Sequence, residues 1–168
     1  ISEVADYVIL VGEKQTKPIL DGLKSKNYSD KKISVINDVT ITLPPGYITS
    51  EDTSHMCVLH NKQTNETIRI RCLDDGADYI NEYNNRLKSL NGEDDIDIQK
   101  NFTNKTLSMI KYENQSSTDK KDITLVFFEK CDHTFSMQFE HFTNETNQEN
   151  MMNFIIDKLK YDFKQNTG

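Results

Sequence analysis

The sequence of 168 residues lacks several features that define large classes of proteins. It has only three cysteines, Cys57, Cys72 and Cys131, and their spacing matches neither a metal-binding motif nor a CxxC redox motif. No apolar run approaches the roughly 18–20 residues that cross a membrane. The chain lacks an excess of positive charge. Its 27 acidic residues outnumber its 20 lysines and arginines and leave a net charge of −7. This balance argues against a surface that binds nucleic acids or anionic membranes.

Motifs of nucleotide and nucleophile chemistry are absent as well. The chain contains no GxxGK[ST] phosphate-binding loop and no GxSxG nucleophile turn. We therefore assign no catalytic residue, no cofactor and no metal ligand. The sequence leaves an enzymatic activity open and favours a non-enzymatic domain.

What the chain does contain predicts a strand, a helix and a second strand over its first 36 residues. An apolar run at 6–11 suits a strand buried on both faces. Thr16 can cap a helix that has Pro18 in its first turn. The run at 32–36 predicts the second strand. Two strands around a helix have the form of a βαβ unit.

The body, residues 38–164, predicts an antiparallel sheet flanked by helices, which is an α+β architecture. Its strands follow from apolar residues at every second position, and its helices from apolar residues three or four apart. We expect strands at 38–43, 57–60, 67–72, 105–113, 122–130 and 133–142, and helices at about 76–91 and 147–164. Val39 and Ile41 should point to one face of the first strand, and Thr40 and Thr42 to the other.

The strand at 67–72 supplies the candidate binding residues. Ile68, Ile70 and Cys72 share one face, while Arg69 and Arg71 share the other. Two arginines on a polar face could hold a carboxylate or phosphate of a partner protein or small ligand. The alternative is an ordinary solvent-exposed face. We retain Arg69 and Arg71 as possible partner-binding residues.

The histidines and acidic clusters have simpler structural interpretations. His133 and His141 are eight residues apart, about 27 Å along an extended strand, which is too far for one metal site. His55 and His60 differ in parity, so an ideal strand turns them to opposite faces. The acidic run at 93–97 lacks the pattern of an EF-hand and predicts a solvated loop. The carboxylates at 74–75 are expected to favour the N-terminus of the following helix.

The cysteines and glycosylation sequons bear on cellular location. We expect three free, mostly buried thiols, with one disulfide and one free thiol as the alternative. Six Asn-x-Ser/Thr sequons hint at an exported protein, but the abundance of Asn, Ser and Thr is the favoured explanation.

The N-terminal segment, residues 1–36, resembles the C-terminal domain of MurF-type Mur ligases. That family places a Gly-ended strand before Gln-Thr-x-Pro-Ile and a helix. The resemblance rests on Gly12, Gln15, Thr16, Pro18, Ile19, Gly22 and Leu23, in that order. It implies a cytoplasmic protein and an origin in cell-wall precursor synthesis. Because the family's phosphate-binding loop is missing, it implies a fragment or relic and no ligase chemistry.

Residues 38–164 resemble the PsbP-like fold. The strand that ends in Leu43-Pro44-Pro45-Gly46-Tyr47 is similar to the start of that group, and the order of elements also fits. Members of the group mostly bind partners, so this resemblance implies a binding role. Our leading hypothesis is a non-enzymatic binding domain of unknown partner. The alternative is a Mur ligase relic without its ATP site.

Overall fold

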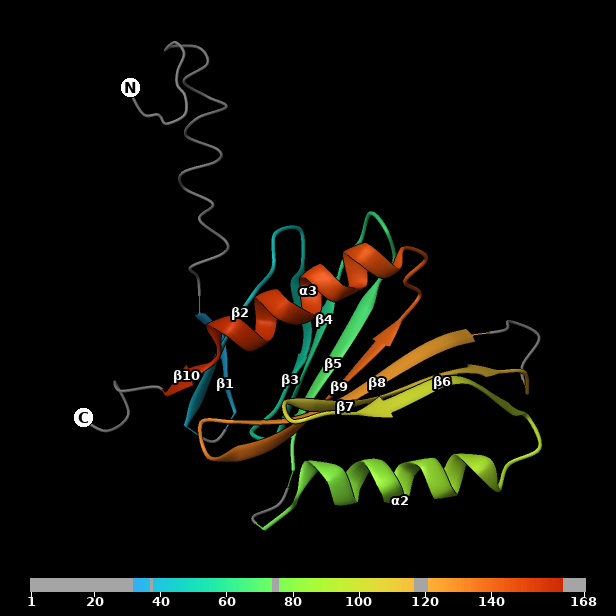
Figure 1. Ribbon diagram of the computed structural model, residues 1–168. Helices are drawn as coiled ribbons and strands as arrows, with labels where there is room; N and C mark the ends of the chain where they lie inside the picture. Colours follow the sequence, from blue (N-terminus) through green and yellow to red (C-terminus); the bar gives the residue numbers. More distant parts are fainter. Residues whose placement is uncertain (1–31, 37, 74–75, 117–120, 162–168) are drawn as a thin grey trace. The chain divides into compact units, whose positions relative to one another are not determined.

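The computed structural model describes residues 32–36, 38–73, 76–116 and 121–161, all of them within one unit that begins at Lys32. Figure 1 shows the arrangement of its elements. The elements are β1 (Lys32–Ile36), β2 (Val39–Thr42), β3 (Ile48–Asp52), β4 (Met56–His60), β5 (Thr67–Cys72), α2 (Tyr79–Asn91), β6 (Ile96–Thr103), β7 (Leu107–Asn114), β8 (Lys121–Lys130), β9 (His133–Glu140), α3 (Glu145–Lys158) and β10 (Lys160–Tyr161).

The strands form two antiparallel sheets. The larger sheet has seven strands in the order β3-β4-β5-β9-β8-β7-β6, and the smaller has three in the order β1-β2-β10. The predicted hairpin is present, with Met56 opposite Arg71 and His60 opposite Thr67. An antiparallel sheet with helices packed on it confirms the α+β class.

The two helices lie on opposite faces of the seven-stranded sheet, α3 above it and α2 below it in Figure 1. The larger core joins α3 and the small sheet to β4, β5 and β9, and the smaller core joins α2 to β7 and β8. Strand β8 contributes to both cores, with Val126 and Phe128 in the larger one and Leu125 and Phe127 in the smaller one. Successive side chains of a strand point to opposite faces, which explains why Ile123–Phe128 is buried without interruption.

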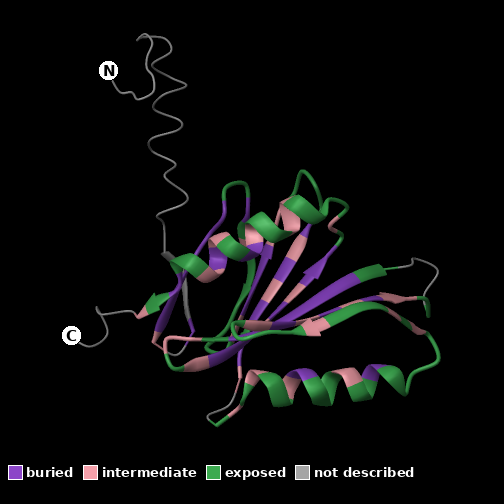
Figure 2. Ribbon diagram, in the orientation of Figure 1, coloured by how far each residue is buried: buried purple, intermediate pink, exposed green. Residues whose placement is uncertain are grey.

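Burial in Figure 2 follows this arrangement. The phenylalanines expected in the core are there, with Phe127, Phe128, Phe135 and Phe139 buried and Phe142 packed beside them. The first strand of the body differs from expectation, since Thr40 and Thr42 are buried together with Val39 and Ile41. Both edges of β2 are paired within the small sheet and α3 contacts the strand, and all four of its residues are buried.

The turn before β3 contains the Pro-Pro-Gly-Tyr sequence. Tyr47 N–H donates to the Pro44 carbonyl at 3.2 Å, and Gly46 has φ +88°. That φ suits a tight turn with Pro before Gly, and a side chain there would be strained. Tyr47 is thereby directed inward, where its hydroxyl donates to Glu66 Oε1 at 2.5 Å. Asn147 of α3 donates to the other oxygen of Glu66 at 3.1 Å, which ties this turn to the helix.

Several predicted elements need correction. Strands β3 and β6 were missed because they are mostly polar, and they are polar because each lies at an edge of the larger sheet. The helix predicted at 147–164 ends at Lys158, where Leu159 turns to extended backbone and leads into β10. Helix α2 begins at Tyr79, and its N-cap is Asp78, whose carboxylate accepts from Asn81 N–H at 3.2 Å. Residues 74–75 lie outside the described residues.

The strand at 32–36 is present, and it pairs antiparallel with β2. The strand at 6–11 and the helix that would follow it lie outside the described residues. The βαβ unit and the division of the chain at 36–38 therefore stay predictions.

In the described part of the chain, no helix is long and apolar enough to cross a membrane.

Candidate partner-binding site

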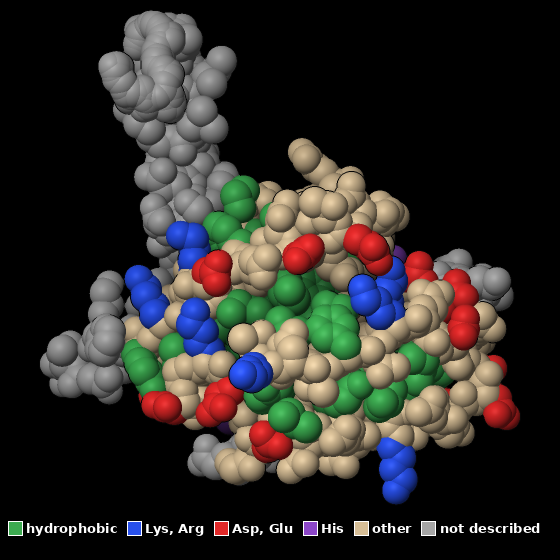
Figure 3. Space-filling view, viewed as in Figure 1, with side chains coloured by type: hydrophobic (Ala, Val, Ile, Leu, Met, Phe, Trp, Pro, Cys, Tyr) green, Lys and Arg blue, Asp and Glu red, His purple; other side chains and the backbone are tan. Residues whose placement is uncertain are grey.

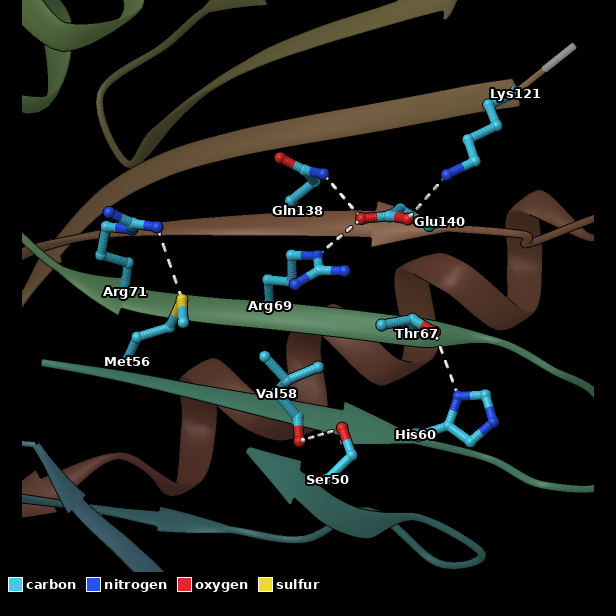
Figure 4. Close-up of polar contacts among 10 residues, drawn as sticks. All are labelled: Ser50, Met56, Val58, His60, Thr67, Arg69, Arg71, Lys121, Gln138 and Glu140. Carbon is cyan, nitrogen blue, oxygen red and sulfur yellow. Dashed lines mark hydrogen bonds and ion pairs between the residues drawn. The ribbon is translucent and has the colours of Figure 1, made fainter. Parts of the chain in front are cut away.

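The face of β4, β5 and β9 that points away from α3 is not covered by either helix. Helix α2 packs on the same side of the sheet, mainly against β6, β7 and β8. We call the uncovered surface the arginine face (Figure 4). It consists of Met56, Val58, His60, Thr67, Arg69, Arg71, Ser136, Gln138 and Glu140.

Arg69 is anchored within this face by Glu140. Its Nε donates to Glu140 Oε2 at 2.8 Å, Gln138 donates to the same oxygen at 2.7 Å, and Lys121 Nζ lies 3.8 Å from Oε1. Burial by itself raises the pKa of Glu140. The hydrogen bonds from Arg69 and Gln138 and the positive charges of Arg69 and Lys121 outweigh this effect, so the pKa is lowered. Arg69 is therefore held in place with its side chain 43% exposed.

Arg71, one pleat farther along β5, is exposed and has no comparable anchor. Its Nη2 donates to Met56 Sδ at 3.4 Å, a weak acceptor. Among the described residues, no carboxylate forms a salt bridge with its guanidinium. Arg71 also lines a hollow of about 380 Å³ together with Thr53, His55, Met56, Cys72 and Leu73. The guanidinium can thus meet an anionic group that enters this hollow.

His55 also lies at this site, although the sequence analysis considered it only together with His60 and did not place it beside Arg71. It precedes β4 by one residue, and its carbonyl accepts from Cys72 N–H at 2.9 Å, which brings it beside Arg71. The cross-strand register that places Met56 opposite Arg71 was the available clue. His60 lies at the far end of β4, where its Nδ1 is 3.1 Å from Thr67 Oγ1. The two histidines do not meet.

The remaining candidates stay apart. His133 Nε2 is bonded to Asp38 Oδ1 at 2.7 Å, whereas His141 follows the other end of β9 with φ +67°. The acidic run at 93–97 is exposed in its carboxylates, partly in a loop and partly in β6. Within the described ranges, no group of three or more His, Cys, Asp or Glu side chains could hold a metal ion.

Cys57, Cys72 and Cys131 form no disulfide with one another. Cys57 and Cys72 are buried in the larger core, and Cys131 is half-buried in the turn between β8 and β9. Burial, with a smaller contribution from the charge of Asp52, raises the pKa of the Cys57 thiol to about 12. This thiol is therefore a core side chain and a poor nucleophile at neutral pH.

Comparison with known proteins identifies the fold. No protein-family model and no curated protein sequence matches the chain. The chain is similar to the solution structure of cyanobacterial PsbP (CyanoP) from Synechocystis sp. PCC 6803, with a TM-score of 0.52 and 8% identity over 78% of this chain and 91% of that one. It is also similar to a crystal structure from Bacteroides thetaiotaomicron VPI-5482, with a TM-score of 0.51 and 17% identity over 79% of this chain and 48% of that one.

A third solved structure, LpqN involved in cell envelope biogenesis of Mycobacterium tuberculosis, gives a TM-score of 0.44 and 13% identity over 84% of this chain and 95% of that one. The likeness to CyanoP shows that the body has a PsbP-like fold. At such low identity the likeness concerns the fold alone. Nothing in these comparisons supports the resemblance of residues 1–36 to MurF-type Mur ligases.

Proposed function

We propose that this protein is a binding domain whose arginine face holds an acidic segment of a partner protein. The observation that carries the proposal is Arg71, exposed at the edge of a hollow and without a salt bridge among the described residues. An arginine in this setting offers planar, bidentate hydrogen bonding to a carboxylate.

The spacing of the two arginines favours an extended segment over a compact ligand. Arg69 and Arg71 are two residues apart on one strand, which separates their Cα atoms by roughly 6.7 Å. Acidic side chains at alternate positions of an extended peptide have the same separation. Since the body carries an excess of negative charge, this local positive surface would also select where an acidic partner docks.

The test is a titration of the isotope-labelled chain with a peptide of alternating Glu and Ser, followed by NMR. We expect shifts at β4 and β5 and no shifts on α2. Arg71→Gln should weaken binding about tenfold, the value of one charge-assisted pair. Arg86→Gln is the matched control, because Arg86 is an exposed arginine on α2. Equal weakening by both substitutions, or no binding at all, would contradict the proposal.

A relic of a Mur ligase remains the second hypothesis. It rests on the resemblance of residues 1–36, nearly all of which lie outside the described residues. Such a relic should retain affinity for a nucleotide or a UDP-sugar, which would raise the melting temperature of the full chain. We expect no such shift with ATP or UDP-N-acetylglucosamine. A shift with either compound would favour the relic.

A further inference from the structure

A second concavity lies on the opposite side of the sheet, between α3 and the strands β6 and β7. It has a volume of about 320 Å³. Its floor is apolar and consists mainly of Phe102, Met109, Val126, Phe139 and Met152. Figure 3 shows hydrophobic side chains gathered in this region, with lysine and acidic side chains around them. We call this concavity the groove. Its size and apolar lining are typical of a site for a small molecule.

The groove exists because the helices cover opposite faces of the sheet. Helix α2 covers β6 and β7 from below, so the upper face of these strands is covered only as far as α3 extends. Val126 and Phe139 are fully buried, whereas Phe102, Leu107 and Met109 remain partly exposed. The floor of the groove is therefore the edge of the larger core, where its side chains become accessible to solvent.

Two lysines stand together at the groove. Lys100 of β6 and Lys111 of β7 are direct partners in the antiparallel register and both line the groove. Like charges directly opposite each other destabilise a sheet unless an anion neutralises them. Lys100 Nζ lies 5.9 Å from the centroid of the Phe102 ring, above the apolar floor. The lysine pair therefore has the features of an anion site next to an apolar surface.

A carboxylate of the chain itself already occupies this anion site. Glu145, the first residue of α3, places Oε2 2.6 Å from Lys111 Nζ. Its pKa is lowered, chiefly by the hydrogen bond and charge of Lys111 and also by the charge of Lys100. The Glu145 side chain is 75% exposed, so solvent reaches it and another carboxylate can exchange with it.

From this geometry we infer that the groove binds a small aliphatic monocarboxylate. The tail lies on the apolar floor, and the ligand carboxylate replaces that of Glu145 at Lys100 and Lys111. The bound state exchanges one ion pair for another and gains the burial of apolar surface, which supplies the affinity. This site shares no residue with the arginine face, so either proposal can fail without the other.

The experiment uses the full chain and three probes: decanoate, acetate, and decyltrimethylammonium, with both long-chain probes below their micellar concentrations. Binding is measured by calorimetry and located by NMR of the methionine methyl groups. Decanoate should shift the methyl signals of Met109 and Met152, which line the groove, and leave Met56 on the arginine face unchanged. Acetate has no tail and should bind far more weakly, and the cationic amphiphile should not compete.

Three variants test the role of each charge. Lys111→Met should weaken decanoate binding about tenfold, because one charge-assisted pair is lost. Glu145→Gln should strengthen it about threefold, because the competing carboxylate is removed. Lys88→Met, on exposed α2, is the matched control and should change nothing. Thermal melts of each variant check folding.

The opposite results would overturn the inference. These are absence of decanoate binding, equal affinity for decanoate and decyltrimethylammonium, or shifts at Met56 as large as those at Met109. Unchanged or weaker binding of decanoate by the Glu145→Gln variant would also overturn the inference. Because the Glu145 side chain is exposed, this substitution is not expected to affect folding.

Discussion

The two halves of the seven-stranded sheet are covered by helices on opposite faces. The half formed by β3, β4, β5 and β9 is covered from above by α3 and the small sheet, and its lower face is open. The half formed by β6, β7 and β8 is covered from below by α2, and its upper face is open beyond α3. One sheet therefore presents two separate open surfaces on opposite sides.

These two surfaces differ in chemistry because their neighbours differ. The arginine face is made of polar side chains that alternate with core residues, and its Glu140 is held by Arg69, Gln138 and Lys121. The groove is apolar because it extends the larger core past the end of its helical cover. We therefore propose a partner protein as the ligand of the polar arginine face and a small molecule as the ligand of the apolar groove.

The largest effect is expected from the centre of the larger core. Phe139 is 1% exposed and meets Phe142 edge-on at 5.5 Å between ring centroids. Phe139→Ala should lower the free energy of unfolding by about 3–5 kcal/mol, measured by denaturant unfolding. If the two halves fold as one unit, amide hydrogens of α2 should lose protection equally. Full protection of α2 in this variant would show that the halves unfold independently.

A smaller effect is expected at Glu140. Glu140→Ala removes the acceptor of Arg69 and should cost about 2 kcal/mol at neutral pH. The pKa of Glu140 is lowered in the folded state, so this carboxylate stabilises the protein above its ordinary pKa of 4.5, and that stabilisation is lost as the pH falls through the folded value. Between pH 7 and pH 3, the free energy of unfolding, measured by denaturant unfolding, should fall less for the variant than for the wild-type protein. Glu149→Ala, at an exposed position on α3, controls for the loss of one carboxylate.

The smallest effects are expected at the helix N-caps, which compare the two halves most directly. Asp78 accepts from Asn81 N–H at 3.2 Å in α2, and Asn144 accepts from Asn147 N–H at 2.9 Å in α3. Replacing either residue by Ala should cost about 1 kcal/mol. Only Asn144→Ala should also alter the groove, since Glu145 follows it directly. A change in decanoate affinity by Asp78→Ala would contradict the separation of the two surfaces.

Much of the fold was predictable where one face of an element is buried. The hairpin of β4 and β5, with Arg69 and Arg71 on the face opposite Ile68 and Ile70, follows from alternation alone. Strands β3 and β6 were not predictable in this way, because edge strands carry few apolar residues. The candidate site was half predictable: the pattern identified both arginines but gave no indication that Arg71 lines a hollow beside His55.

The sequence by itself determined the α+β class, the hairpin of β4 and β5, and the alternation of core and outward-facing residues on β5 and β9. These depend on local periodicity, which is written in neighbouring residues. Only the tertiary structure decided which sheet faces stay open, why Thr40 and Thr42 are buried, and that Lys100, Lys111 and Glu145 meet. Those outcomes depend on which helix covers which face, and contacts between distant segments have no local pattern.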